Sequence, residues 1–125
     1  AVHRWPDETW AANYATQVRS AGWAVTPVST TLRWDKAGLL AACRRAFAFP
    51  EWFGMNWDAL ADSLSDVPVP AAGLLVPWRG WGPMARMFPD DFAVATDILA
   101  EWVTGQPPGR TVLVSLVGPG PITSL

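Results

Sequence analysis

The chain has 125 residues, of which 50% are hydrophobic and 16% are charged. A chain of this length buries about two-thirds of its surface in one domain, so a core can form. The nine tryptophans and the modest charge exclude a disordered chain, and the single cysteine, Cys43, excludes a disulfide scaffold. We expect Cys43 to be a buried thiol. No apolar run reaches the roughly 18 residues that span a bilayer, so a cytoplasmic protein without membrane contact is expected.

The first half of the chain predicts three helices and one strand. Segment 7–21 begins with two acidic residues and is followed by glycine, which predicts a helix. Segment 23–28 predicts a short strand, and its proline favours a sheet edge. Segment 35–47 predicts a second helix capped by its first residue, an aspartate. After a Pro- and Gly-containing loop at 49–55, an asparagine caps a third helix at 56–66.

The second half predicts two strands and one helix. Segment 73–76 is a short apolar run that is typical of a strand buried on both faces. Segment 78–88 is rich in Gly, Pro and Trp, and we expect it to be irregular. Asp90 or Asp91 is expected to cap a fourth helix. Segment 110–117 is β-branched and apolar, which predicts the clearest strand, and a Gly/Pro tail follows it.

Strands that alternate with helices predict an α/β fold with a parallel sheet and right-handed crossovers. We expect a single compact domain in which a three-stranded parallel sheet is packed by about four helices. Residues 1–22 are interpreted as an N-terminal helical extension packed on a domain that spans residues 23–125. The only histidine, His3, lies in a segment that we expect to fray.

The charges are segregated along the chain. No lysine or arginine occurs between Arg45 and Arg79 or between Arg86 and Arg110, and each gap holds four acidic residues. The rest of the chain carries nine basic and three acidic residues, so the net charge of −2 is a cancellation. Such segregation often marks only a solvated face. The net charge also argues against direct nucleic-acid binding.

The predicted third helix carries an acidic ridge, because Asp58, Asp62 and Asp66 recur at four-residue spacing and share one face. Like charges at this spacing cost about 0.2–0.5 kcal/mol per pair, and Asp66 also meets the unfavourable end of the helix dipole. A ridge that weakens its own helix indicates a role outside it. The aromatic residues beside the ridge are Trp52, Phe53 and Trp57. Such side chains either fill the core or form an aromatic rim around a protein-binding patch.

Segment 49–64 combines a loop, a cap and a helix at fixed spacing. It reads hydrophobic, Pro, any residue, two aromatics, Gly, any residue, Asn, hydrophobic, Asp, Ala, Leu, any residue, Asp, Ser and Leu. This pattern resembles the signature of the barstar family, small intracellular inhibitors of secreted ribonucleases, and every fixed position is met. The flanking elements follow the family's order, so the resemblance covers about residues 23–117. It implies a barstar-like fold without catalytic activity, cofactor or metal.

The resemblance implies inhibition by occupation of an active site. The acidic helix and its preceding loop would enter the active site of a secreted, guanyl-type microbial ribonuclease, where carboxylates replace RNA phosphates. By motif position Asp62 is the central carboxylate, Asp58 supports it, and Glu101 is a peripheral acidic contact. A monomer, or a 1:1 complex with the nuclease, is expected. The residues expected at the contact are Trp52, Phe53, Gly54, Asn56, Trp57, Asp58, Asp62, Ser65, Asp66 and Glu101.

The chain departs from the family pattern at a few positions of the contact surface. Ala61 occupies a position that often carries tryptophan in the family. After Ser65 the best-known member continues with a glycine and a contacting tryptophan, whereas this chain has Asp66 and Val67. Gly105 lies near the place of a further acidic residue in the fourth helix. These differences leave the expected fold intact and alter the surface that meets the partner.

Two other functions are compatible with these residues. Asp58 and Asp62 could form a general acid/base pair or, with Asp66 and Glu101, a divalent-cation site of an enzyme. The single His3 leaves a Ser-His-Asp triad or a zinc cluster without ligands. The other alternative is an immunity or interaction module of barstar-like fold that binds another toxin or a protein other than a ribonuclease.

Overall fold

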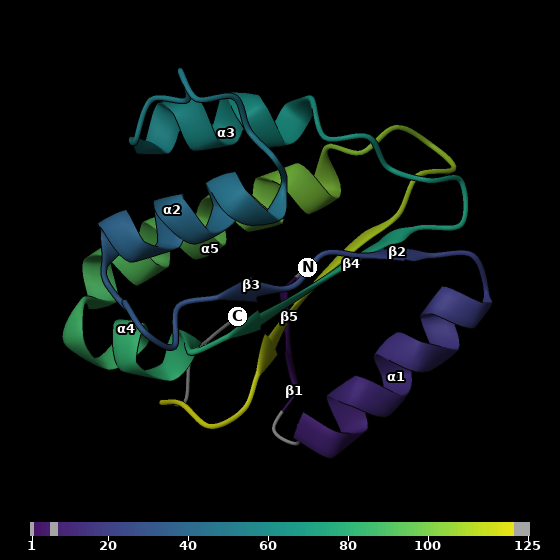
Figure 1. The fold of residues 1–125 in the computed structure, drawn as a ribbon, viewed down its shortest axis with the longest axis horizontal. Helices are drawn as coiled ribbons and strands as arrows, with labels where there is room; N and C mark the ends of the chain where they lie inside the picture. The colour runs from purple at the N-terminus through teal and green to yellow at the C-terminus, as the bar shows by residue number, and fades with distance from the viewer. Residues whose placement is uncertain (1, 6–7, 122–125) are drawn as a thin grey trace.

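The computed structural model describes residues 2–5 and 8–121. Five parallel strands form one sheet in the order β1-β5-β4-β2, and β3 also pairs with β4 (Figure 1). The strands are β1 (Val2–Trp5), β2 (Ala24–Val25), β3 (Val28–Ser29), β4 (Leu74–Arg79) and β5 (Val112–Val117). The predicted α/β class and parallel sheet are confirmed. The prediction of three strands is wrong, because the sheet has five.

The two additional strands have separate causes. Segment 23–28, expected as one strand, is divided into β2 and β3 on either side of Pro27, which has no N–H to donate to a neighbouring strand. The segment around His3, expected to fray, forms β1 and pairs with β5, where His3 lies opposite Ser115. The N-terminal segment therefore supplies an edge strand of the same sheet.

Five helices are observed in the described part of the chain. They are α1 (Glu8–Ser20), α2 (Lys36–Ala46), α3 (Trp57–Ser65), α4 (Trp81–Met87) and α5 (Pro89–Thr104). Helix α4 lies in the segment expected to be irregular, and its Pro83 is tolerated because the first helical turn lacks internal N–H bonds. Helix α5 begins at Pro89 rather than after an aspartate cap, so Asp90 and Asp91 lie in its first turn. The expected start of α1 at residue 7 and the end of the expected tail, residues 122–125, lie outside the described residues.

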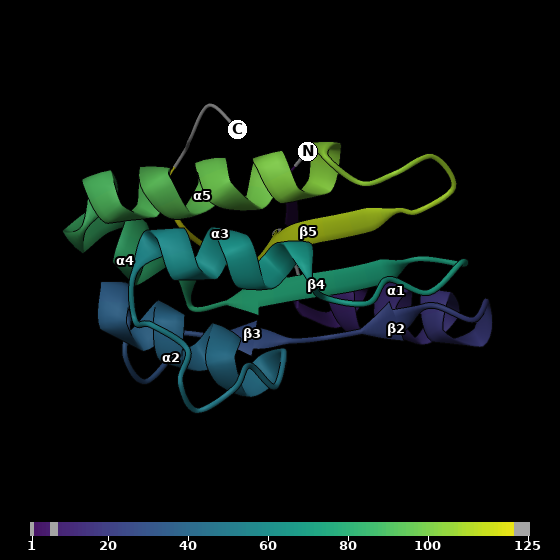
Figure 2. The same cartoon turned by 90° about the horizontal axis from the view of Figure 1, so that it is seen from above.

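The helices cover both faces of the sheet. Figure 1 shows α1 on one face and α2 and α5 on the other, with α3 in an outer layer. The view from above shows α3 lying between and over α2 and α5 (Figure 2). The main core joins Val76 and Val114 of the sheet to Leu39 of α2 and to Leu60 and Leu64 of α3. A smaller core lies under α1. Helix α3 packs mainly against α5.

A buried polar contact fixes the turn after β4. The indole N–H of Trp78 donates to Thr30 Oγ1 at 2.9 Å, and the Thr30 hydroxyl donates to the carbonyl of Gly80 at 2.8 Å. Gly80 has φ +80°, and a Cβ there would lie 2.5 Å from the backbone nitrogen of Thr31. Only glycine fits this turn, which brings the chain from β4 into α4.

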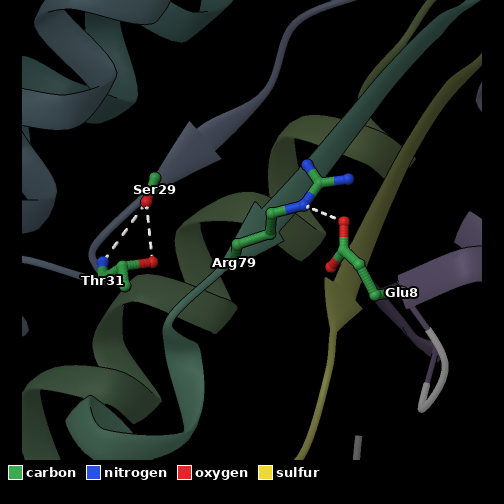
Figure 3. A network of polar contacts seen from close by, with 4 residues as sticks. All are labelled: Glu8, Ser29, Thr31 and Arg79. Carbon is green, nitrogen blue, oxygen red and sulfur yellow. Dashed lines mark hydrogen bonds and ion pairs between the residues drawn. The ribbon is translucent and has the colours of Figure 1, made fainter. Parts of the chain in front are cut away.

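Helix α1 is tied to the central strands by charge as well as by packing. Arg79 Nε at the end of β4 lies 2.6 Å from Glu8 Oε1, and this ion pair joins α1 to the sheet (Figure 3). The same view shows the hydroxyls of Ser29 and Thr31, 2.9 Å apart, in the turn after β3. Both contacts lie at the carboxyl ends of neighbouring strands.

Candidate protein-binding surface

Helix α3 is shaped by a cap at its start and by two leucines on its inner face. Asn56 has extended backbone angles, and its side-chain oxygen accepts from the N–H of Ala59 at 2.8 Å. This geometry satisfies one of the N–H groups that the first turn leaves unpaired. Leu60 and Leu64 are 1% and 0% exposed, so their face points into the core. The predicted third helix and its cap are confirmed, and the opposite face of α3 is free to meet a partner.

The acidic ridge lies on that outer face. Asp58, Asp62 and Asp66 are all exposed, with Asp58 in the first turn and Asp66 at the C-cap. Within the described residues, no lysine or arginine forms an ion pair with any of the three. Ser65, also exposed, donates its hydroxyl to the backbone carbonyl of Asp62 at 2.6 Å and helps to close the last turn. The ridge is therefore a set of solvated carboxylates that its own protein does not neutralise.

The loop before α3 contains three aromatic residues, and only one of them is largely exposed to solvent. Trp52 is 84% exposed, whereas Phe53 is only 6% exposed and packs against Phe49 with ring centroids 5.0 Å apart. The structure thus places Phe53 in the core, although it was expected at the contact. Its burial holds the loop against the helices, which leaves Trp52 as the aromatic group available to a partner.

Gly54 and Trp57 complete the junction between the loop and α3. Gly54 accepts a backbone bond from the N–H of Asn56 at 2.8 Å, and a Cβ there would lie 3.0 Å from the side-chain nitrogen of Asn56. Trp57 is half-buried, and the Lys36 ammonium lies 5.1 Å from its ring centroid, within range of a cation–π contact. This lysine is held over the indole rather than paired to the ridge.

Glu101 lies near the acidic ridge, at a pocket that was not predicted from the sequence. The pocket lies between α3 and α5, has a volume of about 280 Å³, and brings Glu101 of α5 near Ala61 and Ser65 of α3. Its lining residues are Ala61, Ser65, Ile98, Glu101, Trp102, Gly105, Gln106 and Pro107. The sequence feature that could have indicated this pocket is Ala61, because a small residue on an exposed helix face leaves the surface of the neighbouring helix uncovered.

The other acidic residues of α5 are less closely associated with α3. Asp90, Asp97 and Glu101 are exposed and recur at spacings that place them along one side of the helix. Glu101 lines the pocket described above together with Ala61 and Ser65 of α3. Asp91 is half-buried and lines a separate pocket with Met55. The site is therefore the α3 ridge with Glu101 beside it.

Three further features concern metal binding, the cysteine and membrane insertion. In the described part of the chain, no group of three or more His, Cys, Asp or Glu side chains is arranged to hold a metal ion. Cys43 is 2% exposed on α2, and this burial raises the pKa of its thiol to about 12, so it stays protonated near neutrality. None of the described helices combines the length and the apolar character needed to cross a membrane.

The structure combines a parallel α/β fold with an exposed acidic helix, and the loop before that helix exposes Trp52. Residues 25–115, well over half of the chain, match the family model described as Barstar (barnase inhibitor). The chain therefore belongs to the barstar family, whose members are inhibitors rather than enzymes. The matched segment contains all of α3 and Glu101. No curated protein matches the chain.

Proposed function

We propose that this protein inhibits a secreted guanyl-type ribonuclease by covering the enzyme's active site with α3. In this complex the Asp62 carboxylate occupies the place of an RNA phosphate and accepts hydrogen bonds from the basic side chains that bind it. Asp58, one turn earlier, supports it, while Glu101 contacts the edge of the site. The remaining proposed contacts are Trp52, Gly54, Asn56, Trp57, Ser65 and Asp66. The protein is proposed to act in the cytoplasm, as a 1:1 complex.

The observation that carries this proposal is the solvated, unneutralised ridge on a helix whose other face is firmly packed. Carboxylates that meet arginine or lysine in a desolvated site form charge-assisted bonds that are about twice as strong as neutral ones. Because α3 is already fixed by Leu60 and Leu64, little ordering of the backbone is needed on binding. The excess negative charge on α3 and α5 would also accelerate encounter with a basic enzyme, and salt would reduce this effect.

The test compares the loss of binding when one carboxylate is removed at different places. The wild type and the Asp62→Ala, Glu101→Ala and Glu8→Ala variants are titrated by calorimetry into purified barnase and other secreted guanyl-specific ribonucleases. Inhibition of RNA hydrolysis is measured in parallel. Glu8→Ala is the matched control, because it removes one negative charge from α1 on the opposite face of the sheet.

We expect Asp62→Ala to weaken the tightest complex at least a hundredfold, since removal of a central charge leaves the enzyme's basic groups buried without a partner. Glu101→Ala should have a smaller effect, and Glu8→Ala should change affinity less than twofold. Equal, small losses for Asp62→Ala and Glu101→Ala would refute occupation of the active site. Failure to bind any ribonuclease of the set would favour a different protein toxin as the partner.

A further inference from the structure

The pocket between α3 and α5 has walls made mainly of carbon. Ala61 contributes only its methyl group, Ile98 is half-buried, and Trp102 is 7% exposed with its ring packed edge-on against Phe47. Gly105 and Pro107 add no charged group to the lining. The single ionisable residue in the lining is Glu101, which is exposed. The apolar part of this lining favours an apolar occupant, while Ser65, Gln106 and Glu101 supply the polar part of the lining.

The size of the pocket suits a large side chain. A dry cavity of about 150 Å³ with apolar walls binds benzene, and the volume here is about 280 Å³. The pocket is accessible because position 61 carries alanine on the exposed face of α3. A large residue at this position would project over the neighbouring helix and occupy the space from within.

The position of the pocket links it to the proposed contact surface. Ala61 directly precedes Asp62, and Ser65 lies at the end of the same helix, so the mouth of the pocket is continuous with the acidic ridge. A partner that engages both Asp62 and Glu101 covers this mouth, and a pocket left empty within that interface would leave apolar surface without a contact. Well-packed pockets that exclude water within an interface commonly hold the residues that dominate binding energy.

We propose that the partner ribonuclease inserts a large apolar side chain into the pocket between α3 and α5. This inference rests on the proposed function and adds the chemistry of a specificity determinant to it. The aromatic group that resembling proteins often carry at position 61 is here supplied by the partner instead. The pocket then selects among ribonucleases whose basic active sites are alike, because only a partner with a protruding apolar residue fills it.

The test fills the pocket from the inhibitor's own helix. Ala61→Leu and Ala61→Trp are titrated into the ribonuclease that binds the wild-type protein most tightly. Ala12→Trp is the matched control, because Ala12 is equally an exposed helical alanine but lies on α1, on the opposite face of the sheet. Thermal unfolding of each variant shows that the fold is retained, as expected for substitutions at exposed positions.

We expect affinity to fall in the order wild type, Ala61→Leu, Ala61→Trp, with at least a tenfold loss for the tryptophan variant, or about 1.4 kcal/mol. Ala12→Trp should change affinity less than twofold. Unchanged or tighter binding by Ala61→Trp would overturn the pocket proposal, while a large loss in Asp62→Ala would still uphold the proposed function. If Asp62→Ala is also without effect, the proposed function and the pocket fail together.

Discussion

The cap of α3 offers the sharpest test of how this surface is built. Replacing Asn56 with alanine removes the oxygen that accepts from the N–H of Ala59 at 2.8 Å. The loss of such a cap costs about 1 kcal/mol, within a range of about 0.5–2 kcal/mol. Asn56 is exposed, so no cavity adds to the cost. For a chain of this size that loss should lower Tm by about 3–5 °C.

The matched variant is Asn56→Asp, which keeps an acceptor oxygen at the same place. A negative charge at the helix N-terminus is itself favourable by about 0.3–1 kcal/mol, so this variant should unfold at or slightly above the wild-type temperature. Circular dichroism during heating measures both variants, and urea titration provides the free energies of unfolding. Equal losses of stability in the two variants would refute the cap as the source of the effect. We also expect Asn56→Ala to weaken ribonuclease binding several-fold, since Asp58 lies in the turn that frays.

Four further predictions concern the scaffold. Thr30→Val should lower the free energy of unfolding by about 1–3 kcal/mol, because it leaves the buried Trp78 indole N–H without its acceptor. Urea unfolding measures this loss, and a loss close to zero would contradict the contact. Burial raises the pKa of Cys43 to about 12 from 9.0, so its thiol should resist a disulfide reagent at pH 8 until urea unfolds the chain. Because only the unfolded state loses this proton above pH 9.0, stability should decline as the pH rises from there towards 12, and a Cys43→Ala variant should show a weaker decline. Glu8→Gln breaks the ion pair between Glu8 and Arg79, whose side chains are 60% and 32% exposed, respectively. It should therefore lower the free energy of unfolding by less than about 1 kcal/mol. A drop in Tm of about 10 °C, measured by calorimetry, would be inconsistent with this.

The parts of the fold that could be predicted from sequence are those with local causes. The caps at Asp35 and Asn56 are fixed by a side chain and the N–H three residues later, and both were predicted. The inner face of α3 follows from the spacing of its leucines, and the outer position of Asp58 and Asp62 follows with it. The acidic ridge could therefore be predicted from the sequence alone.

The features that were not predicted depend on distant partners. Strand β1 is four residues long and contains two polar residues, so its sequence alone does not indicate a strand. It forms a strand because it pairs with β5, which lies more than a hundred residues later in the chain. The α4 segment was expected to be irregular because glycine and proline punctuate it, yet the buried Trp81 and Met84 hold it helical. The pocket beside Ala61 forms only because α5 lies next to α3. Phe53 is buried in the fold, where its ring packs against that of Phe49.

The place of β5 within the sheet has a consequence for biosynthesis. This strand is the last of the five in the chain, yet it lies between β1 and β4 and joins them. A ribosome adds about 5–20 residues per second. Helix α3 is therefore synthesised several seconds before β5, the strand that completes the sheet. A nascent chain that ends before residue 112 lacks Val112, Val114 and Leu116, which belong to the same core as Leu60 and Leu64 of α3. If the protein inhibits a ribonuclease as proposed, a chain cut off before β5 should inhibit far less than the full chain.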